Sequence, residues 1–258
     1  MVNHEWLKRL SSVPFEMNGP EECVVVTNSI GDVKIRWVES GTVFKLHGNI
    51  AFQRAIKRDF HCKSLADGGF LFDKSMWPNV AKWILAAMQQ SLKQNKLSKA
   101  RGNLKKLSEK LKCVSKTEIN SEGQRRNGQE LLREFLLIER GHCEVSDVKI
   151  PELLVASHIK PWEDCVDGGS ERLDTENVLL LAANWDALFD KKYISFDPET
   201  GKMMKAARID DETLRKFGVP DDWRENVRIP VRTQRRKEYL RWHNRLMKEE
   251  DAKVTRRD

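Results

Sequence analysis

Apolar and polar positions alternate early in the chain with the two-residue period of strands. The pattern predicts strands over residues 22–27, 33–38 and 42–46, separated by polar or glycine-containing turns. Strands that follow one another so closely favour a small antiparallel meander. Apolar residues then recur at helical spacing and predict helices over residues 50–60 and 78–91. We therefore expect the N-terminal region to be mixed in secondary structure.

The next stretch, residues 91–126, is highly charged and is interpreted as a linker or as basic helices. Leu104, Leu107 and Leu111 lie three and four residues apart, which fits one amphipathic helical segment. Residues 120–128 are polar and contain glycine, as is typical of a boundary. A chain of 258 residues is expected to form one or two domains. We place two, residues 1–120 and 121–258.

The second domain begins with a helix over residues 129–139, which Gly141 ends. Short apolar runs at residues 143–145 and 153–159 follow, and we expect these two runs to pair as strands.

Farther along, residues 177–181 lead into a helix over residues 183–190, and a strand is expected over residues 193–196. Acidic residues from Asp210 onward start a helical C-terminal part, whose last helix covers residues 233–249. The fold class is therefore α+β, with an N-terminal mixed α/β domain and a second domain that ends in helices.

Composition narrows the class of protein. Hydrophobic residues make up 40% of the chain and charged residues 33%, which is too apolar for a disordered protein. No apolar run approaches the 18 residues of a membrane span, and residues 1–20 lack the pattern of a secretory signal. The five cysteines are far apart and form no CxxC pair, which argues against a disulfide scaffold or a four-thiolate zinc site. A cytosolic protein is expected.

Charge is distributed unevenly. The formal net charge is +7, yet residues 91–126 alone hold eleven basic and three acidic side chains. Residues 224–258 hold twelve basic and six acidic side chains, so the rest of the chain is net acidic. Such clusters favour contact with the phosphate backbone of a nucleic acid, although a solvated helix face or a flexible linker would show the same composition.

Three segments carry the candidate chemistry. His158 ends an apolar run and is followed by Pro161, Asn177 comes nineteen residues after the histidine, and Asp186 and Asp190 lie four residues apart. An imidazole can deprotonate a water near neutral pH, and carboxylates can hold a hard divalent cation that stabilises charge on a phosphate. Residues four apart share one helix face. Asn177 can bond across its own loop or reach the backbone near the histidine.

These segments resemble the HNH endonucleases, the ββα-metal nucleases, and in particular bacterial restriction-type members. The shared pattern is His-Ile-x-Pro-Trp, then Asn-x-Leu-Leu-Leu, then Asp-x-Leu-Phe-Asp, within residues 127–207. The resemblance implies that His158 is the general base and that Asn177 is the motif asparagine, which orders the loop. It also implies that Asp186 is a metal ligand, with Asp190 as a further one.

The chain departs from the family pattern in ways that affect the metal. Ser157 stands where many members have an acid or a histidine, so it is a weaker candidate ligand. Asp186 stands where the family often has histidine, which favours Mg²⁺ or Mn²⁺ over Zn²⁺. Only Cys143 remains of the cysteine framework that many members carry, with Ser146 at the second position, so no structural zinc is expected.

The candidate contacts to nucleic acid are lysines beside the motifs and cations of the basic stretch. They are Lys160, Lys191, Lys192, Arg101, Lys105 and Lys106. The resemblance implies a DNA endonuclease, type II-like or modification-dependent, whose N-terminal region chooses the DNA. We expect a homodimer on duplex DNA, because recognition sites in duplexes are frequently two-fold symmetric.

Two alternatives stay open. The first is a DNA-binding protein with an inactive nuclease module, which Ser157 and the missing histidine at position 186 favour. The second is a defence nuclease that is switched on by a signal bound in residues 1–90, where neither a GxGxxG motif nor a P-loop is present.

Overall fold

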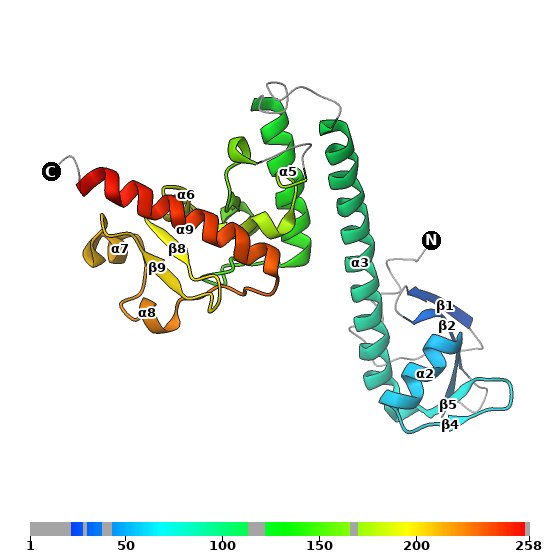
Figure 1. Cartoon of the computed structure of the whole chain (residues 1–258). Helices are drawn as coiled ribbons and strands as arrows, with labels where there is room; N and C mark the ends of the chain where they lie inside the picture. Colours follow the sequence, from blue (N-terminus) through cyan, green and yellow to red (C-terminus); the bar gives the residue numbers. More distant parts are fainter. Residues whose placement is uncertain (1–21, 28–29, 38–42, 113–121, 166–169, 256–258) are drawn as a thin grey trace. The chain divides into compact units, whose positions relative to one another are not determined.

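The structure is a computed structural model, and it describes residues 22–27, 30–37, 43–112, 122–165 and 170–255. The chain divides into two compact units, residues 1–96 and 97–258 (Figure 1). No helix within these described ranges is long and apolar enough to cross a membrane.

The first unit is built on an antiparallel sheet in the order β1-β2-β3-β5-β4. The predicted meander is confirmed as its first three strands. The first has the predicted bounds, and the ends of the other two differ by one to two residues. Alternation along β2 buries Val33 and Ile35 and exposes Asp32 and Lys34, as expected for a sheet with one covered face. The strands are β1 (Glu22–Thr27), β2 (Gly31–Trp37), β3 (Val43–Gly48), β4 (Lys63–Ser64) and β5 (Phe70–Asp73).

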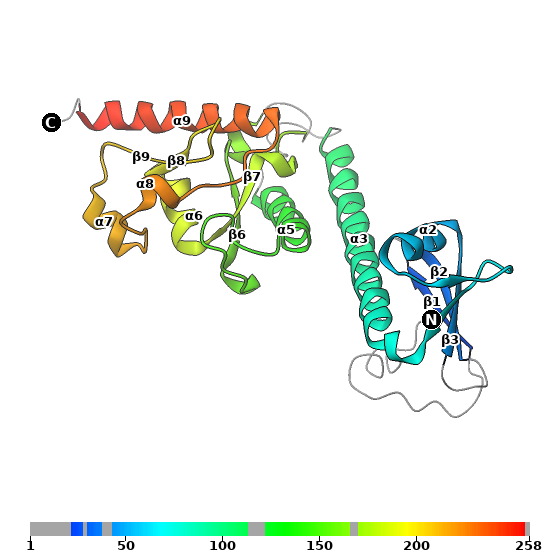
Figure 2. The same cartoon turned by 90° about the horizontal axis from the view of Figure 1, so that it is seen from below.

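Helix α2 (Ile50–Asp59) lies against this sheet (Figure 2). Asn49 caps its first turn, because the Asn49 side chain accepts a hydrogen bond from the Phe52 amide at 3.0 Å. Phe52 and Ile56 are fully buried in a core shared with Val80 and Ile84, from the first part of α3 (Trp77–Leu111). A short 3-10 turn, η1 (Lys74–Met76), precedes α3.

Helix α3 is longer than the predicted helix over residues 78–91, and it absorbs much of the stretch interpreted as a linker or basic helices. Beyond residue 96, Ala100, Leu104, Leu107 and Leu111 are buried in the core of the second unit. The two compact units meet between residues 96 and 97. The expected domain boundary at residues 120 and 121 stays a prediction. Residues 113–121 lie outside the described residues.

The second unit contains a ββα arrangement that follows α5 (Glu122–Glu139). Strand β6 (Leu154–His158) pairs antiparallel with β7 (Val178–Ala182), and His158 lies opposite Val178. Helix α6 (Ala183–Asp190) follows β7 directly and contacts both strands. All five residues of β7 are buried because helices cover this small sheet.

The predicted pairing of residues 143–145 with residues 153–159 is wrong. Residues 143–145 form part of a turn beside β7, where the Glu144 amide donates to the Leu180 carbonyl at 2.9 Å. The Cys143 sulfur accepts hydrogen bonds from the amides of Ala182, at 3.2 Å, and Ser146, at 3.4 Å. The turn therefore makes only individual hydrogen bonds to β7 and forms no ladder with β6. The strand that pairs with β6 is β7.

The remaining elements close the unit. The expected strand after α6 is confirmed as β8, which forms a hairpin with β9, and the expected C-terminal helix is confirmed as α9. The three-residue β9 is too short to stand out in the sequence. The elements are β8 (Ile194–Phe196), β9 (Met203–Lys205), α7 (Asp211–Lys216), α8 (Trp223–Asn226) and α9 (Gln234–Thr255).

Candidate active site

His158 ends β6 with one ring nitrogen anchored. Its Nε2 lies 2.9 Å from the backbone carbonyl oxygen of Arg172. A carbonyl oxygen only accepts hydrogen bonds, so Nε2 carries the proton and Nδ1 keeps a lone pair in the neutral ring. Nδ1 is buried and has no hydrogen-bond partner among the described residues. The tautomer therefore leaves the basic nitrogen uncommitted.

The surroundings of His158 keep its ring neutral. Burial lowers the pKa of His158, and this effect outweighs the opposite ones of the Arg172 carbonyl and the nearby Glu163 carboxylate. The edge of the Trp162 ring packs against the imidazole, with ring centroids 5.9 Å apart. At neutral pH the imidazole is ready to accept a proton.

Asn177 holds the chain segments around His158. It ends the short 3-10 turn η4 (Thr175–Asn177) and is completely buried. Its backbone carbonyl accepts from the Ile159 amide at 2.9 Å, and its side-chain oxygen accepts from the Lys160 amide at 2.8 Å. Its side-chain nitrogen donates to the carbonyls of Lys160 and Glu171, both at 3.1 Å. Asn177 thus reaches the backbone directly after the histidine and also the loop that faces it.

Asp186 lies in the first turn of α6 and is hydrogen-bonded to the Ser157 side chain. Burial raises the pKa of Asp186, the Asp190 carboxylate raises it further, and the Ser157 bond lowers it. Asp190 is one turn farther along, 58% exposed, with a carboxylate oxygen 3.1 Å from the Lys191 ammonium nitrogen. The structure therefore brings Ser157 and Asp186 together and keeps Asp190 at the exposed end of the same helix.

These carboxylates fit a hard divalent cation. A half-buried carboxylate with a raised pKa, close to a second carboxylate, gains from a bound positive charge. Mg²⁺ is commonly held by one or two carboxylates, with waters and substrate phosphate oxygens completing its shell. Within the described part of the chain, no group of three or more His, Cys, Asp or Glu residues gathers to hold a metal. Asp186 would be the principal ligand, supported by Asp190 and oriented by Ser157.

The comparison with known families decides the identity of this region. A family model described as HNH endonuclease matches residues 143–197, which include His158, Asn177, Asp186 and Asp190. This segment, residues 143–197, is therefore similar to HNH endonucleases. The match supports nuclease activity in general. No curated protein matches the chain.

Three lysines near the HNH motifs differ in what they contact. The Lys160 side chain is 11% exposed, pairs with Glu171 at 2.7 Å and lies 6.0 Å from the centroid of the Trp242 ring. Lys191 is 71% exposed and pairs with Asp190 at 3.1 Å. Lys192 follows with a left-handed backbone, φ 59°, at the turn out of α6. Lys191 is therefore exposed, Lys192 is partly buried, and Lys160 is turned inward.

The cations of the basic stretch lie on the part of α3 that belongs to the second unit. Arg101 and Lys105 line a cavity of about 260 Å³ together with Phe135 and with Asp174 and Thr175, which lie at the start of η4. The Arg101 guanidinium lies 5.6 Å from the centroid of the Phe135 ring. Lys105 approaches Glu109 at 3.9 Å, and Lys106 is exposed. Arg101 and Lys105 thus line the same cavity as residues just before Asn177.

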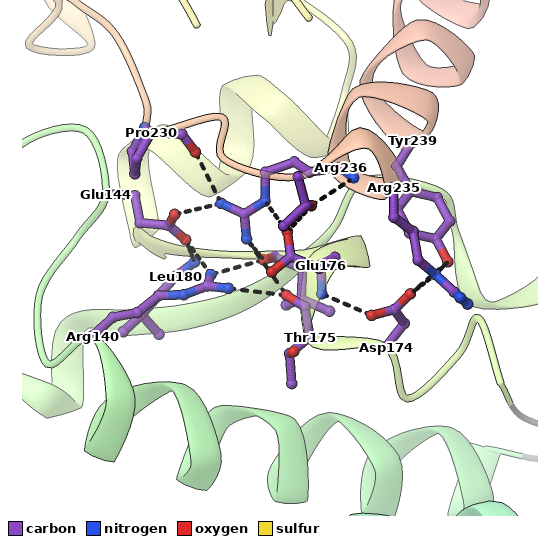
Figure 3. Close-up of polar contacts among 12 residues, drawn as sticks. Arg140, Glu144, Asp174, Thr175, Glu176, Leu180, Pro230, Arg235, Arg236 and Tyr239 are labelled. Carbon is purple, nitrogen blue, oxygen red and sulfur yellow. Dashed lines mark hydrogen bonds and ion pairs between the residues drawn. The ribbon is translucent and has the colours of Figure 1, made fainter.

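A buried ionic cluster borders the HNH motifs and carries no sequence motif of its own. Its members are Arg140, Glu144 and Arg236, and Figure 3 shows them beside Thr175 and Glu176. The side chains of Glu144 and Arg236 are 3% and 4% exposed. Because Glu144 and Arg236 are separated by 92 residues in the chain, nothing in the sequence pairs them.

A second buried histidine lies outside the motifs, on α9. His243 stacks on Phe189 with ring centroids 4.1 Å apart, and its Nε2 lies 3.1 Å from the Phe189 carbonyl oxygen. Its Nδ1 lies 2.8 Å from the hydroxyl oxygen of Ser195. Burial lowers the pKa of His243 to about 4. Both ring nitrogens are committed, so His243 fastens α9 to the end of α6.

Proposed function

We propose that this chain is a metal-dependent endonuclease that hydrolyses phosphodiester bonds of double-stranded DNA, as a restriction enzyme that is type II-like or modification-dependent. The observation that supports it most is His158, whose anchored Nε2–H leaves Nδ1 as a proton acceptor within an HNH domain. Nuclease chemistry needs a group that deprotonates water near neutral pH, and a neutral imidazole does so.

In this mechanism His158 takes a proton from the attacking water at Nδ1. The Arg172 carbonyl keeps the ring oriented through Nε2 and favours the imidazolium that forms, because a carbonyl oxygen faces the positive ring. Asn177 holds Ile159 and Lys160, which fixes the end of β6 on which the ring stands. The expected products carry 5′-phosphate and 3′-hydroxyl ends.

Asp186, with Asp190 and the Ser157 hydroxyl, would hold Mg²⁺ or Mn²⁺. When bound, such an ion stabilises negative charge on the phosphoryl oxygens and on the leaving 3′ oxygen. The Ser157 hydrogen bond keeps the Asp186 carboxylate oriented. The oxygen donors of this set suit a hard ion better than Zn²⁺.

Contacts to the DNA backbone complete the proposal. Lys191 and Lys192 beside the motifs, with Arg101, Lys105 and Lys106 on α3, would contact phosphates, and each such contact strengthens the salt dependence of binding. Lys160 would act through its pair with Glu171, which holds the loop that carries Arg172. We assign the choice of DNA to the N-terminal region. We also propose that the protein is cytoplasmic and that a homodimer cuts both strands. Light scattering of the DNA complex would measure the number of subunits.

The direct experiment compares cleavage and binding in matched variants. His158→Ala is expected to abolish cleavage of duplex DNA and to leave the mobility shift of a bound duplex unchanged. His142→Ala is the control, because His142 is 42% exposed in the same domain and bonds to the Arg140 carbonyl. Cleavage products of the wild type should be resealed by a DNA ligase, which requires 5′-phosphate and 3′-hydroxyl ends. Full cleavage by His158→Ala would contradict the proposal.

A further inference from the structure

One buried carboxylate joins two arginines from distant parts of the chain. Glu144 bonds to the guanidinium of Arg140, which directly follows α5, and to that of Arg236 on α9, at 2.7 Å for the latter. It also accepts from the Leu180 amide at 3.0 Å. A second carboxylate, Glu176, lies 3.3 Å from Arg236 Nε. Two carboxylates thus balance the two buried positive charges, as burial of ions requires.

The two guanidinium groups converge on the backbone around Asn177. Arg140 donates to the carbonyl oxygen of Val178 at 2.9 Å and to that of Thr175 at 3.0 Å. Arg236 donates to the same two carbonyls at 3.2 and 3.5 Å. Figure 3 shows these bonds approaching η4 and the start of β7. The two carbonyls lie on either side of Asn177, so two planar forks restrain the backbone on both sides of one residue.

The restraint continues from Asn177 to His158 by two routes. One runs through the Asn177 side chain to the backbone of Lys160, two residues after the histidine. The other runs through the side-chain nitrogen of Asn177 to the Glu171 carbonyl. Glu171 precedes Arg172, whose carbonyl anchors His158 Nε2. Asn177 thus fixes both the strand that carries the imidazole and the loop that orients it.

We propose that Arg236 is a positioning residue for His158. Arg236 acts through Asn177, with Arg140 and Glu144 as its partners. The proposal rests on the proposed function, since it assigns Arg236 to the reaction in which His158 is the base. Arg236 lies beyond residues 143–197, the segment that matches the family model, so α9 becomes part of the nuclease machinery. Arg236 touches none of the reacting groups, so its loss should lower kcat and leave KM unchanged.

Arg236→Lys tests this assignment, because lysine keeps the charge and loses the fork. We expect kcat to fall by about tenfold or more and KM to stay within about twofold of the wild type. Arg241→Lys is the matched control, since Arg241 lies on the same helix and pairs with Glu199 at 2.7 Å, outside the cluster. The control should keep wild-type kcat.

A double-mutant cycle separates positioning from general support of the fold. In the Asn177→Ala background, Arg236→Lys should lower kcat by less than about threefold further, because the route to His158 is already broken. A full tenfold additional loss, or wild-type kcat in a folded Arg236→Lys protein, would overturn the proposal. If Arg236→Lys does not fold, Arg140→Lys carries the same expectations, because Arg140 donates to the same carbonyls.

Amide hydrogen exchange gives a readout that does not depend on cleavage. The Lys160 amide donates to Asn177, so its protection should fall in Arg236→Lys and not in Arg241→Lys. Unchanged protection of the Lys160 amide in Arg236→Lys would overturn the positioning role. Absence of cleavage by the wild type would instead overturn the proposed nuclease function and leave the exchange result to decide the positioning.

Discussion

The Asn177 side chain bonds to both backbone polar groups of Lys160, its N–H and its carbonyl oxygen. The side-chain oxygen of Asn177 accepts from the Lys160 amide at 2.8 Å, and its nitrogen donates to the Lys160 carbonyl at 3.1 Å. The two residues are 17 positions apart in the chain. Because the pair is buried, water cannot replace these bonds when the asparagine is lost. The relationship therefore ties folding of the motif loop to the position of the imidazole.

Asn177→Ala is expected to lower the free energy of unfolding by about 3 kcal/mol, since it leaves several buried backbone groups without partners. Cleavage by the folded fraction should fall by about a hundredfold, because the end of β6 loses its restraint. Urea unfolding and a cleavage assay on the same preparation measure both effects. Asn184→Ala is the control, as Asn184 makes one exposed bond to the Phe217 carbonyl. Equal losses in the two variants would contradict the role given to Asn177.

The pH dependence of cleavage should report the buried imidazole. Burial lowers the pKa of His158, and the neutral ring is the active form. The value of kcat/KM should therefore rise with pH through a midpoint below 6.5, the ordinary pKa of histidine, and then level off. Initial rates between pH 4.5 and about 8.5 measure the midpoint. A midpoint well above 6.5 would show that another group limits the reaction.

The two aspartates of α6 should differ in importance for the metal. Asp186→Asn removes the charge of the half-buried carboxylate that bonds to Ser157, and it should lower cleavage by about a hundredfold at any Mg²⁺ or Mn²⁺ concentration. Asp190→Asn removes an exposed carboxylate that pairs with Lys191, and about a tenfold loss is expected. Titrations of cleavage against each ion give the comparison. A larger loss in Asp190→Asn would reverse the order of the two ligands.

His243 should make the folded protein sensitive to acid. Its folded pKa is about 4, below the ordinary value near 6.5, so the unfolded chain binds more protons between these pH values. The free energy of unfolding should fall by about 3 kcal/mol from this residue as pH drops from about 6.5 to about 4. Above that window the contribution is fully present.

Urea unfolding of the wild type and His243→Gln at pH 7, 6, 5 and about 4 isolates the contribution of His243 to the free energy of unfolding. The variant is expected to be less stable at pH 7, because Ser195 and the Phe189 carbonyl lose partners, yet flatter in its pH dependence. Lys192 and Asp190 act on the His243 ring in opposite directions, so their charges largely offset. Parallel pH curves for the two proteins would contradict the assignment.

The elements around the candidate site could be predicted from the sequence because each has a strong local pattern. The run that ends at His158 and the helix of Asp186 keep nearly the predicted bounds as β6 and α6. The partner of β6 was predicted wrongly, because strand pairing depends on residues distant in the chain. The nearby turn at Cys143 offers a competing apolar run.

Interactions between distant side chains could not be predicted. Lys160 was expected at phosphates, yet the folded loop brings Glu171 within 2.7 Å of it. Glu144 and Arg236 become neighbours only when α9 packs beside the turn after α5. Charged residues are usually exposed, so their sequence pattern gives no sign of burial. These contacts arise from tertiary packing, which a pattern of hydrophobic positions does not encode.

The most direct test of the account is a plasmid cleavage assay with Mg²⁺, with Mn²⁺ and with EDTA, on methylated and unmethylated DNA. The wild type and His158→Ala are compared under the same conditions, with His142→Ala as the control. We predict discrete fragments from the wild type and the control, which disappear with EDTA and with His158→Ala. Cutting by His158→Ala, or cutting that persists in EDTA, would contradict it, and no cutting on any substrate would favour a DNA-binding or signal-gated protein.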